Sequence, residues 1–514
     1  MVKTPLTTMK LPKENMNTYL TPVTTPEMVD QAAHWAHEAH LISAQQTPEI
    51  RASWLVSVAQ GLRDNSDELI ALAMTDTNLS RKRLEGELTR SAFQLELLAE
   101  EIRSGVALDA VIDHADPHWG MGPRPDIRRV NVPLGVIGVF GASNFPFAFS
   151  VIGGDSASAL AAGCAVLHKI HPGHLALARR TAEIVIDVLH GAGAPDGLFG
   201  VVEGREAAVA LVQHPLVKAI GFTGSTAGGR ALFDLACARP EPVPFFGELG
   251  SINPVFVLPG AWGRRQEEIL AGYANSFTMG MGQFCTKPGL LFVPAGEKEN
   301  GGYEKLVALL REVQLDKLLT PGLHESYLTT RDEVSKLAGI KVLVPGSDDE
   351  KPEPTVFTID IHDVRYNPEV LHREMFGPAT ILVEYEDTAQ LVELAGQLQG
   401  QLTVTLHADD DDDLTTLMEA ITAKTGRVVF NEWPTGVTVS YAQHHGGPYP
   451  ATTAPSATSV GTASIGRFMR PVAYQGLPDS ALPPSIQESN PWGIARRVDG
   501  QFHPAAGDGA TDEF

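Results

Sequence analysis

The chain has 514 residues, of which 43% are hydrophobic and 20% charged, as expected of a globular protein with about two to four domains. Its formal net charge of −23 argues against nucleic acids and anionic membrane surfaces as partners. The three cysteines, Cys164, Cys237 and Cys285, are too few for a disulfide framework, so we expect a reducing, cytoplasmic location. The first residues lack the apolar core of a signal peptide, and glycines and prolines interrupt the uncharged stretch 130–154, which excludes a membrane span.

Apolar residues recur every three or four positions through residues 26–104, which predicts helices. Short apolar runs then alternate with helical segments, at 136–140, 164–169, 198–204, 218–224 and 243–249. A second block of this kind extends from about 251 to 440. Such alternation is typical of parallel sheets covered on both faces, so the predicted fold class is α/β with two doubly wound sheets. The first helix after 136–140 is expected over roughly 147–162, and the Pro-rich end of the chain is expected to be extended.

Cys285 lies in the segment GQFCTKPG, between Gly282 and Gly289. A thiolate nucleophile needs an exposed loop of this kind, whose backbone N–H groups can meet a developing oxyanion. A buried structural cysteine is the alternative interpretation, and it suits Cys164 and Cys237, which lie in apolar runs.

Glu248 ends a predicted strand in FFGELGSINP, where apolar surroundings are expected to raise its pKa and suit it to act as a general base. The alternative is a carboxylate that binds backbone amides or caps a helix. Asn144 follows another strand in GASNFPF, where its amide is either an oxyanion donor or an ordinary turn residue.

The fingerprint G-x-G-x-x-G is absent, and the best candidate phosphate cradle is FTGSTAGGR, where Gly224 and Ser225 connect a strand to a helix. The histidines of HKIHPGH cross from a strand into a loop, so they should not share one face and no metal site is expected. The adjacent pair His444 and His445 would point apart on a strand, and no role is assigned to it.

Taken together, the segments resemble the aldehyde dehydrogenase superfamily, with SNFPF, KIHP, FTGS, GELGSINP, GQFCT and REMFGP in that family's order and spacing. Longer segments, including NFPFAFSVIGGDSASALAAGCAV, QHHGGPYPATT and GRFMRPVAYQ, resemble the α-ketoglutaric semialdehyde (2,5-dioxopentanoate) dehydrogenases and bacterial NADP-dependent fatty aldehyde dehydrogenases within it.

The resemblance implies that Cys285 attacks an aldehyde, that Asn144 holds the oxyanion and that Glu248 activates the water that releases a carboxylic acid. It also implies a set of residues that bind a nicotinamide dinucleotide: Lys169, Gly224, Ser225, Glu374 and Phe376.

The resemblance further implies a domain organisation. Residues 1–117 and 139–250 would bind the dinucleotide, and 251–458 would form the catalytic domain. Residues 118–138 and 459–480 would form a small β element that pairs subunits into a homodimer or homotetramer, followed by an extended tail at 481–514.

Pro172 stands where NAD-preferring members of the family commonly carry a glutamate, so NADP or dual use is favoured, with Arg205 as a candidate partner of the 2′-phosphate. For a semialdehyde with a distal carboxylate, Lys287 and Arg90 are the candidate cations. Phe145 and Phe149 could instead line an apolar tunnel for fatty aldehydes. Two further alternatives are a cofactor-free cysteine esterase and a non-catalytic protein on the same fold.

Overall fold

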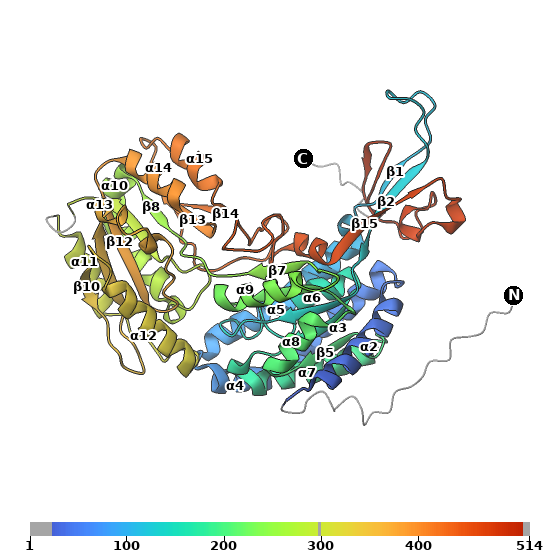
Figure 1. Ribbon diagram of the computed structural model, residues 1–514, viewed down its shortest axis with the longest axis horizontal. Helices are drawn as coiled ribbons and strands as arrows, with labels where there is room; N and C mark the ends of the chain where they lie inside the picture. The colour runs from blue at the N-terminus through green and yellow to red at the C-terminus, as the bar shows by residue number, and fades with distance from the viewer. Residues whose placement is uncertain (1–22, 297–299, 507–514) are drawn as a thin grey trace.

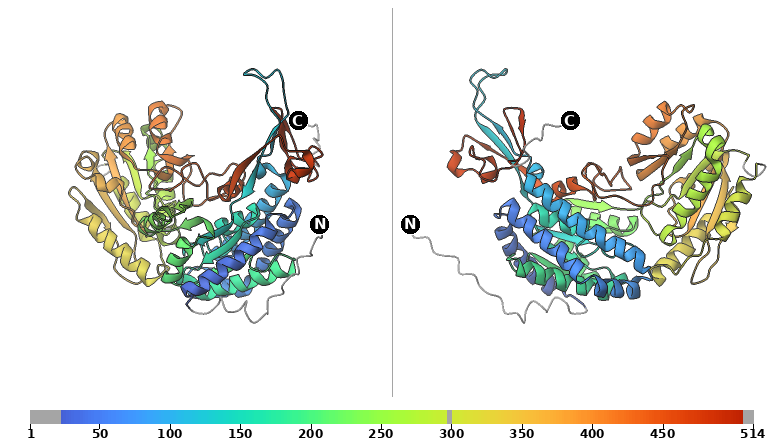
Figure 2. Two further views of the ribbon diagram at one scale, coloured as in Figure 1. Left: turned by 45° about the vertical axis from the view of Figure 1, so that its right-hand side comes forward. Right: turned by 180° about the vertical axis from the view of Figure 1, so that it is seen from behind.

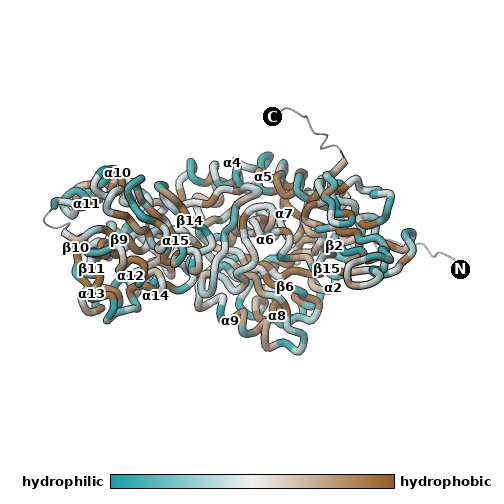
Figure 3. Tube along the Cα trace, turned by 90° about the horizontal axis from the view of Figure 1, so that it is seen from above, coloured by the Kyte–Doolittle hydropathy of each residue, from teal (hydrophilic) through white to brown (hydrophobic). Residues whose placement is uncertain are grey.

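The structure is a computed structural model that describes residues 23–296 and 300–506. Two α/β lobes lie side by side, and a smaller β-sheet projects from the N-terminal lobe as an arm (Figure 1; Figure 2). Apolar and polar segments alternate along the helices of the N-terminal lobe, such as α5 (Arg81–Ser104) and α8 (Arg205–Gln213) (Figure 3). Across the described residues, we find no helix with the length and apolar character needed to cross a bilayer.

The N-terminal lobe contains a five-stranded sheet of order β5-β4-β3-β6-β7, in which all neighbours are parallel. Its strands are β3 (Val136–Phe140), β4 (Ala165–Lys169), β5 (Phe199–Val202), β6 (Val217–Thr223) and β7 (Phe245–Glu248). The strands are almost continuously apolar because helices cover the sheet. These helices are α6 (Gly154–Ala162), α7 (Leu175–Gly191), α8 (Arg205–Gln213) and α9 (Thr226–Cys237).

Four further helices pack around this lobe: α2 (Pro26–Ser43), α3 (Pro48–Asp64), α4 (Ser66–Thr77) and α5 (Arg81–Ser104). Three of them begin where the sequence provides an N-cap, because the hydroxyls of Thr25, Thr47 and Ser80 each accept a backbone N–H from the first turn. The helix expected at 147–162 begins only at Gly154, because the chain first forms a series of turns around Pro146.

The second lobe is built on a seven-stranded sheet of order β10-β11-β12-β9-β8-β13-β14, parallel except for β10. Its strands are β8 (Val255–Val257), β9 (Leu290–Pro294), β10 (Lys341–Pro345), β11 (Thr355–Asp360), β12 (Ala379–Tyr385), β13 (Gln401–His407) and β14 (Thr425–Phe430). Its helices are α10 (Pro259–Thr278), α11 (Gly302–Arg311), α12 (Pro321–Ser335), α13 (Ile361–Val364), α14 (Thr388–Gln397) and α15 (Thr415–Thr422).

The arm is a mixed sheet of order β15-β2-β1-β16-β17. Its strands are β1 (Val111–Asp113), β2 (Ile127–Pro133), β15 (Met469–Gln475), β16 (Arg496–Val498) and β17 (Gln501–His503). The prediction of an extended tail is therefore wrong in part, because β16 and β17 extend this sheet, and β1 begins before the predicted boundary at 118.

The short 3-10 helices are η2 (Val106–Leu108), η3 (Pro172–His174), η4 (Met279–Gly282), η5 (Pro368–Leu371), η6 (Thr462–Phe468), η7 (Asp479–Ala481) and η8 (Pro484–Ile486).

Parallel strands end at one edge of their sheet, and ligands of such folds bind outside that edge. Lys169 ends β4 and Glu248 ends β7, while Asn144 and Ser225 follow closely after β3 and β6. The N-terminal sheet thus carries four of the predicted site residues at its carboxyl edge.

Candidate active site

Cys285 lies on a loop that follows η4 and precedes β9. Three successive residues before it have positive φ, namely Gly280, Met281 and Gly282. A Cβ on Gly282 would lie 2.2 Å from the carbonyl oxygen of Gly377, so only glycine permits this close approach. On the other side, the amide of Asn253 donates to the carbonyl of Cys285 at 2.8 Å, which fixes the backbone of the nucleophile.

Three side chains that are distant in sequence meet beside this loop. The Nε2 atom of His445 lies 3.5 Å from the sulfur of Cys285 and 2.9 Å from Oε1 of Glu248. The hydroxyl of Ser459 donates to the other oxygen of Glu248. Glu248 and His445 are buried, and Cys285 is partly exposed. A carboxylate, an imidazole and a thiol therefore form a continuous chain of contacts.

The electrostatics of Glu248 differ from the prediction. Burial raises its pKa, but the interactions with His445, Ser459 and Arg467 outweigh burial, and the pKa lies below its ordinary value. The predicted upward shift is wrong because the sequence does not reveal these partners. Glu248 is consequently an ionised carboxylate at neutral pH and can accept a proton directly.

The pKa of the Cys285 thiol is raised well above its ordinary value, first by burial and then by the carboxylates of Glu248 and Glu374. The guanidinium of Arg427 acts in the opposite direction. Cys285 therefore rests as a thiol and needs a proton acceptor before it can attack. The thiol lies beside Nε2 of His445, at 3.5 Å, and it also interacts with the carboxylate of Glu248.

The structure places Asn144 against the loop that carries Cys285. The amide of Asn144 donates to the carbonyl of Gln283 at 3.0 Å, two residues before the nucleophile. Arg83 of α5 donates to the carbonyl of Asn144 at 2.6 Å, and its guanidinium lies 5.0 Å and 4.7 Å from the ring centres of Phe145 and Phe284. Arg83, which the sequence analysis missed, therefore connects the loop of Asn144 to the loop of Phe284 and Cys285.

Arg90 and Phe149 lie on the same side of the site. The guanidinium of Arg90 lies 5.3 Å from the centre of the Phe149 ring, which is itself 6.4 Å from the ring of His445. Arg90 makes only long hydrogen bonds of 3.4 Å to the carbonyl of Val437, and its buried Nη1 has no hydrogen-bond partner among the described residues. Its charge interacts with those of Cys285 and Glu248.

Lys287 does not occupy the position that the sequence predicted. Its buried ammonium donates to the carbonyls of Met375 and Ala379, both at 2.7 Å. It also interacts with the charge of Glu374, whose pKa is raised by burial and lowered in turn by this lysine. Lys287 therefore holds the loop that carries Glu374 and Phe376, and it is not available as a substrate ligand.

The candidate cofactor residues line the carboxyl edge of the N-terminal sheet. Ser225 caps α9 by accepting the N–H of Gly228, and this exposed N-terminus fits a pyrophosphate. Arg205 is exposed at the first turn of α8, beside the end of β5, and Lys169 is half-buried at the end of β4. Within this part of the described chain, the residues present fit a dinucleotide.

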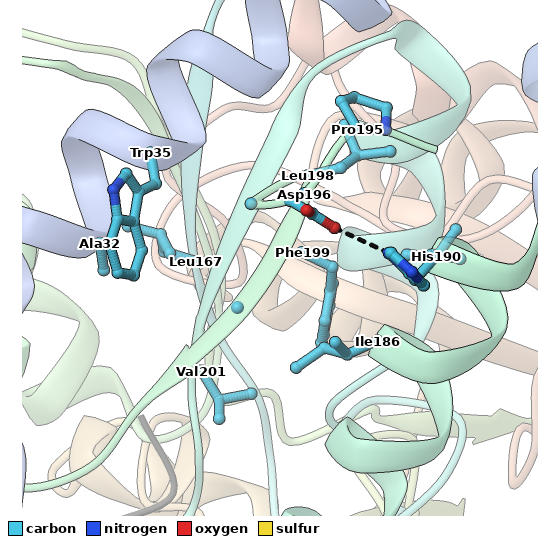
Figure 4. A pocket seen from close by; sticks show the side chains of 13 residues that line it. Ala32, Trp35, Leu167, Ile186, His190, Pro195, Asp196, Leu198, Phe199 and Val201 are labelled. Atoms are coloured by element: carbon cyan, nitrogen blue, oxygen red, sulfur yellow. Dashed lines mark hydrogen bonds and ion pairs between the residues drawn. The ribbon is translucent and has the colours of Figure 1, made fainter. Parts of the chain in front are cut away.

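A separate apolar pocket lies between α2, α7 and the edge strand β5 (Figure 4). Trp35 and Phe199 line it, and an ion pair joins His190 to Asp196 at 2.9 Å. Since its lining has no cysteine, it is not the catalytic centre.

The site combines a cysteine, a buried carboxylate and an amide donor at the edge of a doubly wound sheet. This combination is typical of an oxidoreductase or an acyl-transfer enzyme. The model of the "Aldehyde dehydrogenase family" matches residues 8–448, and the chain belongs to this family of NAD(P)-dependent enzymes. The cofactor-free esterase and the non-catalytic alternative are thereby set aside.

Two relatives are 40% identical. One is "Alpha-ketoglutaric semialdehyde dehydrogenase" of Acinetobacter baylyi, aligned over 94% of this chain and 93% of its own length. The other is "Alpha-ketoglutaric semialdehyde dehydrogenase 2" of Azospirillum brasilense, aligned over 92% and 91%. The crystal structure of HpcC from Thermus thermophilus has the same fold, with a TM-score of 0.75, 23% identity and coverage of 88% of this chain and 87% of that one.

The charges around Cys285 predict how its reactivity depends on pH. In a Cys237→Ser background, which removes an exposed thiol, Glu248→Gln should lower the midpoint pH of Cys285 alkylation, because a negative charge that disfavours the thiolate is lost. Arg427→Gln should raise the midpoint, because a positive charge is lost. Each shift should be about one pH unit, equivalent to ~1.4 kcal/mol. Iodoacetamide labelling rates across pH measure it, and shifts in the same direction for both variants would contradict the account.

Lys287→Met should raise the KM for the dinucleotide, because the loop with Glu374 loses its anchor and that carboxyl loses its neighbouring cation. Arg51→Met is the matched control, since Arg51 is also a buried cation that donates to two carbonyls, those of Ala161 and Ala162. Both variants should lose about 1–3 kcal/mol of unfolding free energy in denaturant titrations. An equal rise in KM for both variants would show that Lys287 acts only through stability.

Proposed function

We propose that this enzyme oxidises a semialdehyde that carries a distal carboxylate, with 2,5-dioxopentanoate as substrate and 2-oxoglutarate as product. The observation that carries the proposal is the buried, unpartnered Nη1 of Arg90 beside the catalytic cysteine. A buried N–H without an acceptor is costly unless a ligand accepts it in the working complex, although the guanidinium as a whole also interacts with the charge of Glu87. The names of the two 40% identical relatives agree with this substrate.

The first half of the reaction uses the contact chain at Cys285. The Cys285 thiol, which is partly exposed, loses its proton to the solvent. The N–H at Nε2 of His445, which donates to Glu248, lies 3.5 Å from the sulfur and stabilises the thiolate, so Glu248 stays ionised. The thiolate then bonds to the aldehyde carbon. The amide of Asn144 and the backbone N–H of Cys285 stabilise the oxyanion without protonating it. A nicotinamide dinucleotide held at the carboxyl edge of the N-terminal sheet would supply the hydride acceptor needed to convert this adduct into a thioester on Cys285.

The second half of the reaction is hydrolysis. Glu248 is ionised and buried, so it can remove a proton from a water molecule that attacks the thioester carbonyl. The bond to sulfur breaks, the carboxylic acid leaves and Cys285 is restored. His445 and Ser459 keep the carboxylate of Glu248 oriented during this step.

A fatty aldehyde is the second candidate substrate. The rings of Phe145 and Phe149 meet edge to face with their centres 5.5 Å apart, and Phe149 presents apolar surface close to His445. This surface suits an alkyl chain, but an alkyl chain would leave the buried Nη1 of Arg90 without an acceptor.

The proposed cofactor is NADP, with NAD as the second candidate. A glutamate near the adenosine ribose would repel a 2′-phosphate, and Glu203, at the end of β5, is such a residue. Its carboxylate is held by Arg179 at 2.8 Å, which neutralises it. Arg205 is exposed two residues further on and remains available to the phosphate. We also propose a homodimer or homotetramer, since β15 leaves an outer strand edge on the arm.

Arg90→Met tests the substrate. The kcat/KM for 2,5-dioxopentanoate should fall about 100-fold, since a charge-assisted contact of ~2.7 kcal/mol is lost. The kcat/KM for pentanal, which has no carboxylate, should change by less than about threefold. Steady-state rates at 340 nm provide the measurement. Equal efficiency of the wild type with both aldehydes would refute the carboxylate hypothesis and favour the apolar alternative.

Arg205→Ser tests the cofactor preference. The kcat/KM for NADP should fall about tenfold or more, whereas that for NAD should stay nearly constant, because only NADP has the 2′-phosphate. Glu206→Gln, an exposed neighbour on α8, is the control and should not reduce the use of NADP. A wild type that uses NAD far more efficiently than NADP would overturn this assignment.

A further inference from the structure

The catalytic cluster also has the composition of a metal site. Cys285, Glu248 and His445 each offer one ligand atom, and these sulfur, oxygen and nitrogen atoms all lie within 4.8 Å of one another. Thiolate, carboxylate and imidazole are the ligands of zinc in proteins. We propose that this cluster binds a zinc ion reversibly and that the bound ion inhibits the enzyme by occupying the nucleophile.

The distances between the ligand atoms suit tetrahedral coordination. With Zn–S about 2.3 Å and Zn–N and Zn–O about 2.0–2.1 Å, the sulfur and nitrogen lie about 3.5 Å apart and the nitrogen and oxygen about 3.3 Å apart. The observed separations are 3.5 Å for Cys285–His445 and 2.9 Å for His445–Glu248. Of these two separations, the one between His445 and Glu248 has to lengthen by about 0.4 Å, and the sulfur and the Glu248 oxygen lie within 4.8 Å of each other. Three protein ligands leave the fourth position to water.

The imidazole of His445 is free to present Nε2 to the ion. Its Nδ1 has no hydrogen-bond partner among the described residues, so no N–H donates to this atom and Nδ1 can carry the ring proton when Nε2 binds the ion. The other ligand cluster, Asp30, His34 and His214, differs in this respect. There, Nδ1 of His214 accepts the N–H of Leu216 at 3.2 Å, so the ring proton is on Nε2. Nε2 faces Asp30 and donates to it, so it has no lone pair for a metal ion. That cluster is a hydrogen-bonded contact.

The surroundings allow a cation to enter. A small cavity of about 20 Å³, enough for one ion or water molecule, adjoins Glu248 and His445, and the loop with Ala454 and Ala457 lines it. Arg467 also lines this cavity, but its charge is balanced by Asp155 at 2.8 Å. The positive charges of Arg90 and Arg427 act on Cys285 and lower the affinity of the cluster for a zinc ion. Chelators should therefore remove the ion.

Inhibition follows from the identity of the ligands. A sulfur coordinated to zinc is unavailable to an aldehyde carbon, so zinc should compete with aldehyde. The proposal goes beyond the dehydrogenase reaction, and binding can be measured without any turnover.

Cobalt(II) titration of the reduced, apo protein is the test, with zinc displacement as confirmation. All proteins carry Cys237→Ser to remove the exposed thiol. The parent should bind one equivalent of cobalt, with the absorption bands of a tetrahedral thiolate complex. Cys285→Ala should lose the bands, His445→Gln should weaken binding at least tenfold, and His214→Gln should match the parent. Circular dichroism confirms that each variant is folded.

Two results would overturn the proposal. One is a parent protein that binds no more cobalt than Cys285→Ala, and the other is loss of binding in His214→Gln with retention in His445→Gln. A parent that binds cobalt but never reduces NADP or NAD would leave the metal site intact and refute only the proposed function.

Discussion

The buried carboxylate of Glu248 is the constraint on which the site depends. An ionised carboxyl group is stable in the interior only when hydrogen bonds replace its hydration. Its partners, His445 and Ser459, both lie on the segment that returns from the second lobe to the first. Backbone bonds of Gly247 and Leu249 to Thr453 and Ala451 hold the same segment against β7. The contacts that stabilise the carboxylate of Glu248 therefore also connect the two lobes and place the imidazole of His445 beside Cys285.

The same principle organises the neighbouring loops. Asn253 donates to the carbonyl of Cys285, and Arg83 donates to that of Asn144. Lys287 donates to two carbonyls beside Glu374. Catalytic groups on loops are thus held by polar side chains from other segments. One buried nitrogen of Arg90 has no hydrogen-bond partner within the described chain, which leaves a donor for the substrate.

Local patterns in the sequence were sufficient for the strands of the N-terminal sheet and for Asn144, Glu248 and Cys285, because glycines and strand ends mark them. Contacts between distant segments were not predictable in this way. His445 lies 160 residues from Cys285, and its doublet with His444 was interpreted as a strand although the segment forms none. The pKa of Glu248 was predicted in the wrong direction for the same reason, because its partners lie about 200 residues further along the chain.

The central claim is that Glu248 hydrolyses an acyl group formed on Cys285, and Glu248→Gln tests it most directly. Rapid mixing of this variant with 2,5-dioxopentanoate and NADP should give a burst of about one NADPH per chain, followed by slow turnover. Peptide mass spectrometry of the quenched protein should find the acyl group on Cys285. Unimpaired steady turnover with no burst, or an acyl group on another residue, would contradict the account.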